Sequence, residues 1–190
     1  MLACCLGRVA MAETKMQLNL TFMPIEDRLL FRIASGVPGV AMEEYRLWLT
    51  RRLVKLLWNA LDRMVDISTS MDPRVAPEGR DAIKQFQQSA ALSNTDFATP
   101  YAYENVTAPL GPNPLLIHKF QVRKGAGSSH ILSVEATTGQ TVNITLGLQL
   151  IHSLRKLLVD IIKQADWDFH PYAIISEDAF YVTDVPKTIN

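Results

Sequence analysis

The stretch EEYRLWLTRRLVKLLWNALDRMVD, residues 43–66, carries two periodicities in succession. Before Thr50 the apolar residues alternate with polar ones, which is the period of a half-buried strand. After Thr50 they recur three and four residues apart, which is the period of an amphipathic helix. We therefore predict a strand that ends at Thr50 and a helix from about Arg51 to Asp66. The residues of the helical stripe are Leu53, Val54, Leu57, Ala60, Leu61, Met64 and Val65.

A second stretch repeats this order about one hundred residues later. Val142, Ile144 and Leu146 alternate with polar residues, and helical spacing follows from near Gly147. One offset, 150 − 53 = 97, aligns the two stretches from strand to helix end without a gap. The aligned apolar positions of the second helix are Leu150, Ile151, Leu154, Leu158, Ile161 and Ile162.

Two more alternating strands precede each of these strand–helix stretches. In the first half they centre on Leu18 and Phe31. In the second half Leu116, Phe120 and Val122 are expected to face the core, and a turn at Gly125–Ser128 leads to the next strand. The pattern predicts an α+β fold built on a duplicated βββα unit, with antiparallel sheets packed against two long helices.

The predicted organisation is one domain over residues 15–168, made of pseudo-repeats 15–66 and 114–165. Connector 67–113 joins them; it is rich in proline and contains a helix over Arg80–Ser93. Residues 1–14 are expected to form a flexible extension. Residues 169–190 are expected to form a tail or a weak hairpin, with Ile174–Ile175 opposite Phe180–Val182.

Composition limits the class of protein. The chain has 190 residues, of which 48% are hydrophobic and 20% charged, so it has the composition of a globular protein. Its net charge is zero, which disfavours a dedicated nucleic-acid-binding domain unless its basic residues cluster. The cysteines are the adjacent pair Cys4 and Cys5. With no apolar run of about 20 residues, we expect a cytoplasmic protein without membrane contact.

One face of the first predicted sheet gathers basic residues around a tryptophan. If the alternate residues point into the core, Arg28, Arg32, Arg46 and Trp48 point outward together. Basic and aromatic residues combined in this way form stacking platforms in proteins that bind single-stranded nucleic acid. The alternative is that the connector or a second subunit covers Trp48, while the arginines pair with Glu43, Glu44 or Asp27.

The start of the first helix adds three cations. Arg51, Arg52 and Lys55 stand beside the exposed N–H groups of the first turn, where an anion could bind. The alternative is that these side chains are simply solvated. Together with the sheet residues, the candidate ligand-binding or partner-binding set is Arg28, Arg32, Arg46, Trp48, Arg51, Arg52 and Lys55.

No catalytic site can be assembled by spacing. We expect His118 to face the core from its strand and His152 to lie on the flank of its helix. The sequence has no metal-ligand spacing and no nucleophile beside a base. We therefore predict no catalytic residue, no metal and no cofactor, and expect that the chain is not an enzyme.

Parts of the chain resemble a family of uncharacterised bacterial proteins. The resemblance rests on Glu44–Arg52, Lys55–Trp58, Asp96–Pro100 and Leu154–Trp167, covers roughly residues 15–167 and implies no activity. The order of elements is also similar to that of the Whirly-type and PUR-type single-strand binders. That similarity concerns the order of the fold alone and does not define function.

Two functions of different classes remain open. The first is a non-enzymatic interaction or scaffold protein, homo-oligomeric, that binds a protein partner at the sheet face around Trp48. The alternative is a single-stranded DNA or RNA binder that uses the same basic and aromatic face.

Overall fold

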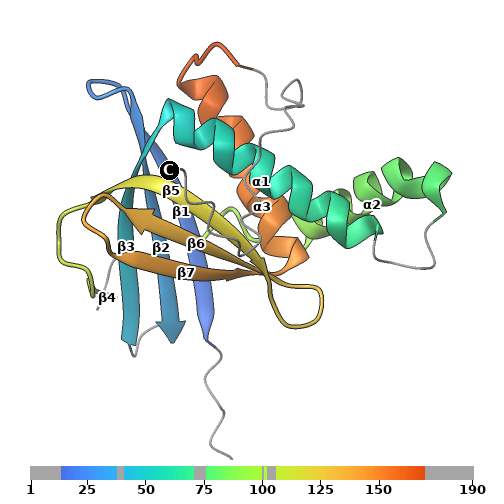
Figure 1. Cartoon of the computed structure of the whole chain (residues 1–190), viewed down its shortest axis with the longest axis horizontal. Helices are drawn as coiled ribbons and strands as arrows, with labels where there is room; N and C mark the ends of the chain where they lie inside the picture. Colours follow the sequence, from blue (N-terminus) through green and yellow to red (C-terminus); the bar gives the residue numbers. More distant parts are fainter. Residues whose placement is uncertain (1–13, 38–40, 71–75, 100, 102–105, 170–190) are drawn as a thin grey trace, which may run out of the picture.

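The computed structural model describes residues 14–37, 41–70, 76–99, 101 and 106–169. The predicted N-terminal extension, apart from Thr14, and the predicted hairpin within the tail lie outside these residues. The described residues form an α+β fold, a mixed sheet with helices gathered on one side of it (Figure 1).

The sheet has seven strands, six of which follow in the order β1-β2-β3-β5-β6-β7. Two antiparallel meanders, β1-β2-β3 and β5-β6-β7, make up the two halves of this sheet. The short β4 pairs in parallel with the start of β3. The bounds are β1 Lys15–Met23, β2 Arg28–Val37, β3 Ala41–Thr50, β4 Val106–Thr107, β5 Leu115–Lys124, β6 His130–Ala136 and β7 Thr141–Leu146.

The two halves join where β3 and β5 run parallel. Leu47 pairs with Leu115 and Trp48 with Leu116, and we call this short contact the β3–β5 seam. The expectation of purely antiparallel sheets was therefore wrong. Each meander is antiparallel, but after the connector the chain returns along the edge of β3 in the same direction as β3. Periodicity within a strand carries no signal for such a distant neighbour.

The helices are α1 (Arg51–Ser70), α2 (Arg80–Ser93) and α3 (Leu148–Gln164), and a single 3-10 turn, η1 (Pro77–Gly79), precedes α2. α1 begins at the predicted residue but continues four residues past Asp66. α2 has the predicted bounds. It projects from the body (Figure 1), and of its described residues Ala91 alone is buried. None of the described helices has the length and apolarity needed to span a membrane.

The core lies between the sheet and helices α1 and α3. Leu47 from β3, Leu57 and Leu61 from α1, Leu132 from β6 and Leu158 from α3 have no exposed surface. These residues belong to the alternating and helical stripes of the sequence, so the hydrophobic pattern predicts this core. Burial of such side chains stabilises the fold by about 1.5–3 kcal/mol each.

An irregularity in β5 changes which residues face the core. The β5–β6 register shifts between Ile117 and Lys119, so that Ile117 is buried and Leu116 is 37% exposed. The expectation that Leu116 and His118 face the core was wrong, because the bulge reverses the alternation before Phe120. The side chain of His118 is 45% exposed and lies 3.7 Å from the Glu135 carboxylate.

Candidate binding face of the sheet

The sheet face opposite the helices carries a row of apolar side chains. In register across three strands, Leu30 pairs with Trp48 and Trp48 with Leu116. Leu30 and Trp48 are partly exposed, and Leu116 is exposed. With Arg28, which lies beside them, these residues define what we call the Trp48 face. Sequence reasoning missed Leu116, since its position depends on the bulge in β5.

Arg28 lies over the indole of Trp48. Its guanidinium carbon is 5.1 Å from the ring centroid, within the range of a cation–π contact. Its Nε also forms an ion pair with Glu26 at 2.8 Å. Arg28 is therefore paired with an acidic residue, as the covered-face alternative expects, although the partner is Glu26 and not Asp27.

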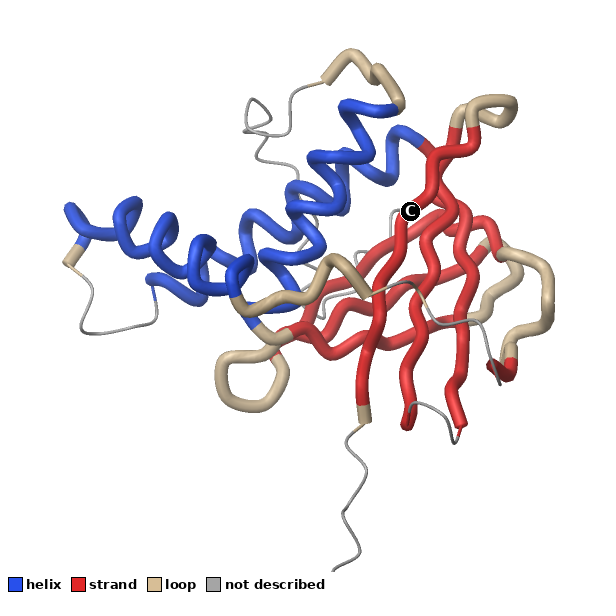
Figure 2. Tube along the Cα trace, turned by 180° about the vertical axis from the view of Figure 1, so that it is seen from behind, coloured by secondary structure: helices blue, strands red, loops and turns tan. Residues whose placement is uncertain are grey.

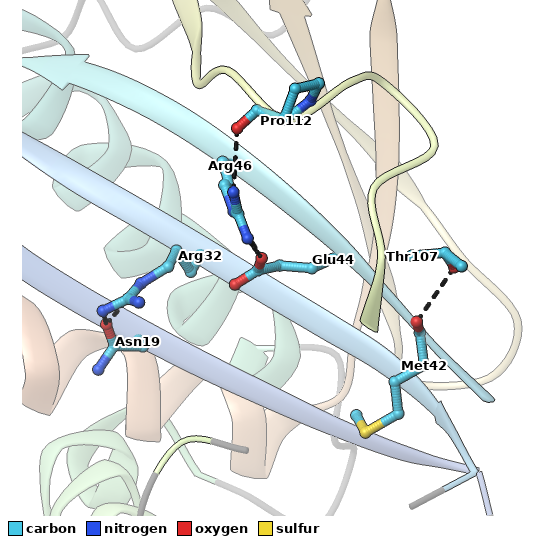
Figure 3. A network of polar contacts seen from close by, with 7 residues as sticks. All are labelled: Asn19, Arg32, Met42, Glu44, Arg46, Thr107 and Pro112. Atoms are coloured by element: carbon cyan, nitrogen blue, oxygen red, sulfur yellow. Dashed lines mark hydrogen bonds and ion pairs between the residues drawn. The ribbon is translucent and has the colours of Figure 1, made fainter. Parts of the chain in front are cut away.

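Arg46 is held by two acceptors. It forms an ion pair with Glu44 at 2.5 Å and donates from Nη1 to the backbone oxygen of Pro112 at 3.0 Å (Figure 3). Glu44 is 2% exposed although it stands on the sheet face away from the core. A buried carboxylate requires a partner, so Arg46 here neutralises Glu44.

Arg32 is fixed against β1. Its guanidinium donates to Oδ1 of Asn19, at 2.8 Å from Nη2 and 3.2 Å from Nε (Figure 3). The same group lies 5.1 Å from the ring centroid of Tyr101 in the connector. Seen from behind, the helices lie together on one side of the strands (Figure 2).

The connector thus contacts one end of this sheet face. Thr107 donates to the backbone oxygen of Met42 at 3.2 Å, and Pro112 accepts from Arg46 (Figure 3). Met42 and Glu44 are buried at this end, whereas the Trp48 face at the other end is partly open. The described connector contacts therefore lie at the Glu44 end of the sheet face, whereas the alternative placed the connector or a second subunit over Trp48.

The candidate cations of α1 do not join the Trp48 face. Arg51 lies over Trp167, at 5.9 Å, and Lys55 lies over Phe169, at 5.0 Å. Both rings belong to the core cluster on the helix side. The structure therefore divides the predicted set, because Arg28, Arg32, Arg46 and Trp48 share the outer face while Arg51 and Lys55 contact core-side aromatic rings. Arg52 is exposed.

Trp167 anchors the chain after α3. Its Nε1 donates to Oδ1 of Asp27 at 2.5 Å, in the turn between β1 and β2, where Asp27 has φ of +47°. Phe22 packs edge-on against the indole, with the ring centroids 5.9 Å apart. Sequence reasoning missed this anchor, since these residues are far apart in the chain.

The second half of the same sheet face is polar. Lys119 forms an ion pair with Glu135 at 3.4 Å, and Ser133 donates to Oδ1 of Asn143 at 2.6 Å. Arg123 donates to Ser133 at 3.4 Å. The Trp48 face therefore ends near β5.

Two histidines are buried. Burial, and secondarily the charge of Lys124, lowers the pKa of His130. Burial first, and then the charge of Arg155, lowers the pKa of His152 to about 4. His152 is 2% exposed, so its expected place on the helix flank was wrong. Within the described ranges no three His, Cys, Asp or Glu residues group in a way that could hold a metal ion.

In comparisons with known proteins, no family model, no curated protein and no solved structure matches the chain. The resemblances drawn from the sequence therefore remain expectations.

Proposed function

We propose that the chain is a non-enzymatic binding protein whose Trp48 face takes a protein partner. The observation that carries this proposal is the row Leu30–Trp48–Leu116, which crosses three strands in direct register and ends on an exposed leucine. Tryptophan and arginine are enriched among the few residues that carry most of the binding energy of a protein interface.

The charges of the face favour a protein over a nucleic acid. Arg28 and Arg46 are already paired with Glu26 and Glu44, and Arg32 is engaged by Asn19. A phosphate backbone would have to compete with these carboxylates, and affinity for nucleic acid depends mainly on cations that replace released counterions. The zero net charge of the chain supports the same choice.

The duplication of the βββα unit is part of this proposal. Trp58 and Arg155 are related by the sequence offset, 155 − 58 = 97, and they contact each other: the guanidinium lies 5.0 Å from the indole centroid. A contact between equivalent positions is expected for two units related by a local twofold axis. The two outer faces have diverged, since only the first carries a tryptophan.

The proposal is tested by selecting ligands for the face itself. A displayed library of random peptides is selected on the full chain, with counter-selection on the Trp48→Ala variant. We expect peptides that bind the native chain and lose at least about tenfold in affinity on Leu116→Ser, the loss of a hot-spot contact. Phe86→Ser is the matched control, because Phe86 is also exposed, at 71%, but lies on α2 away from the face.

The outcome against the proposal is equally defined. A selection that yields no peptide after counter-selection on Trp48→Ala, or peptides that bind Leu116→Ser as well as the native chain, would count against binding at this face. A labelled oligonucleotide that binds at low salt, dissociates steeply with added salt and requires Trp48 would instead establish the single-stranded nucleic-acid function.

A further inference from the structure

The last strand of the sheet has an open edge. Among the described strands β7 pairs with β6 alone, so one side of its backbone has no strand beside it. The hydrogen bonding in the turn before β7 shows which backbone groups of the strand point toward this open side. Ala136 donates to the backbone oxygen of Gln140 at 2.8 Å, which makes these two residues a hydrogen-bonded pair.

Hydrogen-bonded and non-hydrogen-bonded pairs alternate along an antiparallel ladder, so this pair fixes the direction in which the backbone groups of each β7 residue point. Val142, Ile144 and Leu146 bond to β6, while the N–H and C=O groups of Thr141, Asn143 and Thr145 point outward from the sheet. The side chains of these last three residues are exposed on the sheet face away from the helices. The edge therefore presents backbone donors and acceptors, and the three residues that carry them have polar side chains.

Among the described residues, β7 lacks the usual protection of an edge strand. Its sequence, TVNITL, contains no proline, lysine or arginine, and its register with β6 has no irregularity. Charged residues, prolines and bulges are the devices that keep edges from pairing with other chains. The other edge strand, β1, begins with the charged residue Lys15, and α3 packs against it.

We propose that β7 pairs antiparallel with β7 of a second copy of this chain, about a twofold axis that passes beside Asn143. This dimer does not depend on the Trp48 face. In this register Asn143 stands opposite Asn143 of the second copy, and Thr141 stands opposite Thr145. Each of these pairs exchanges two hydrogen bonds, so the two strands form about six.

The side chains favour a second copy over an unrelated segment. On the outer face every pair across the axis is Thr–Thr or Asn–Asn, and on the core face Val142 stands opposite Ile144. The edge is therefore complementary to itself and neutral, and no like charges oppose one another. The sheets of the two copies then continue into one, which removes both β7 edges. Pairing about a twofold axis is closed and does not propagate into a fibre.

A disulfide placed on the axis tests the register. Opposed residues of a hydrogen-bonded pair have Cα atoms about 5.5 Å apart, within the roughly 4.4–6.8 Å that a disulfide spans. In the full chain with Cys4→Ser and Cys5→Ser, we expect Asn143→Cys to form a covalent dimer under mild oxidation. Gln121→Cys is the matched control, because Gln121 lies in the same row two strands inward and should not form a covalent dimer.

A charge pair tests the association without a covalent bond. By analytical ultracentrifugation over a concentration series, we expect the native chain to be dimeric at high concentration. Asn143→Lys and Asn143→Glu should each be monomeric, since like charges meet on the axis, and their mixture should form heterodimers. Both substitutions remove the same bond from Ser133, so each serves as the other's control for folding.

Three results would overturn the proposal. They are a native chain that stays monomeric at every concentration, equal cross-linking of Asn143→Cys and Gln121→Cys, and a dimer that persists in both charged variants. Any of the three places self-association elsewhere or shows that it does not occur. Binding of random peptides at the Trp48 face is measured on a different surface, so its failure leaves this dimer unaffected.

Discussion

Acid should destabilise the fold through His152. This side chain is 2% exposed, and neither ring nitrogen has a hydrogen-bond partner among the described residues. Burial and the charge of Arg155 hold its pKa at about 4, against 6.5 for an ordinary histidine. Between these values the unfolded chain binds a proton at this residue and the folded chain does not. The free energy of unfolding therefore falls as pH decreases from about 6.5 to about 4.

The size of the effect follows from the displacement of the pKa. The difference is 6.5 − 4 = 2.5 pH units, and each unit corresponds to 1.36 kcal/mol. The full loss at this residue is thus about 3 kcal/mol, a large part of the 5–15 kcal/mol that stabilise a typical domain. Above about pH 6.5 both states are neutral at this residue, and its contribution does not change with pH.

The assay is urea denaturation of the native chain and of His152→Leu between pH 4 and pH 8. Leucine removes two buried nitrogens without partners, so the variant should be at least as stable at pH 7. Its advantage should grow by about 2–3 kcal/mol toward pH 4. Val159→Leu, a change without a titratable group on the same helix, should leave the pH dependence as it is.

One result would refute this reasoning. If the difference between the native chain and His152→Leu stays constant from pH 8 to pH 4, then His152 does not carry the proton linkage. A direct titration of the His152 ring by NMR gives the same decision, since a midpoint near 6.5 contradicts the buried, neutral state.

Further variants test three particular contacts by urea denaturation. Arg46→Met should lower the free energy of unfolding by about 2–3 kcal/mol, because it leaves the buried Glu44 carboxylate unpaired. Adding Glu44→Leu to this variant should recover most of the loss. If Arg46→Met alone is as stable as the native chain, the pairing is contradicted. Gly36→Ala should cost more than about 2 kcal/mol, since its Cβ would lie 2.2 Å from a backbone oxygen at φ +148°. Gly139→Ala is the control: its φ is +85° but no atom lies within 4 Å of the added Cβ, so it should cost only about 1 kcal/mol. Equal losses at Gly36 and Gly139 would show that the close contact of the Cβ with the backbone oxygen at Gly36 is not decisive. Trp167→Phe should cost about 1 kcal/mol through the lost indole donor, and unchanged stability would show that this hydrogen bond adds nothing.

The sequence predicts local structure well because periodicity records burial. The start of α1 at Arg51 and both bounds of α2 follow from spacing and composition. The outward direction of Arg28 and Trp48 follows from alternation, since β2 and β3 pair without irregularity. The alternation failed in β5, where the bulge after Ile117 exposes Leu116.

The partners of the candidate site could not be predicted in the same way. Trp167 reaches Asp27 and Arg51 only because α3 brings the end of the described chain back to the first hairpin. Tyr101 and Pro112 reach the sheet through a connector without strong periodicity. Such contacts depend on tertiary arrangement, which alternation along one strand does not encode.

The β3–β5 seam also bears on the order of folding. Each meander is built from hairpins between neighbouring strands, whereas the seam joins Leu47 to Leu115, residues separated by 115 − 47 = 68 positions. Closing a long loop costs entropy before its contacts form, so the meanders should form first and the seam last. Weakening the seam should then accelerate unfolding and leave the refolding rate nearly unchanged. The row that carries the Trp48 face would be complete only at the end of folding, because Trp48 and Leu116 stand on opposite sides of this late contact.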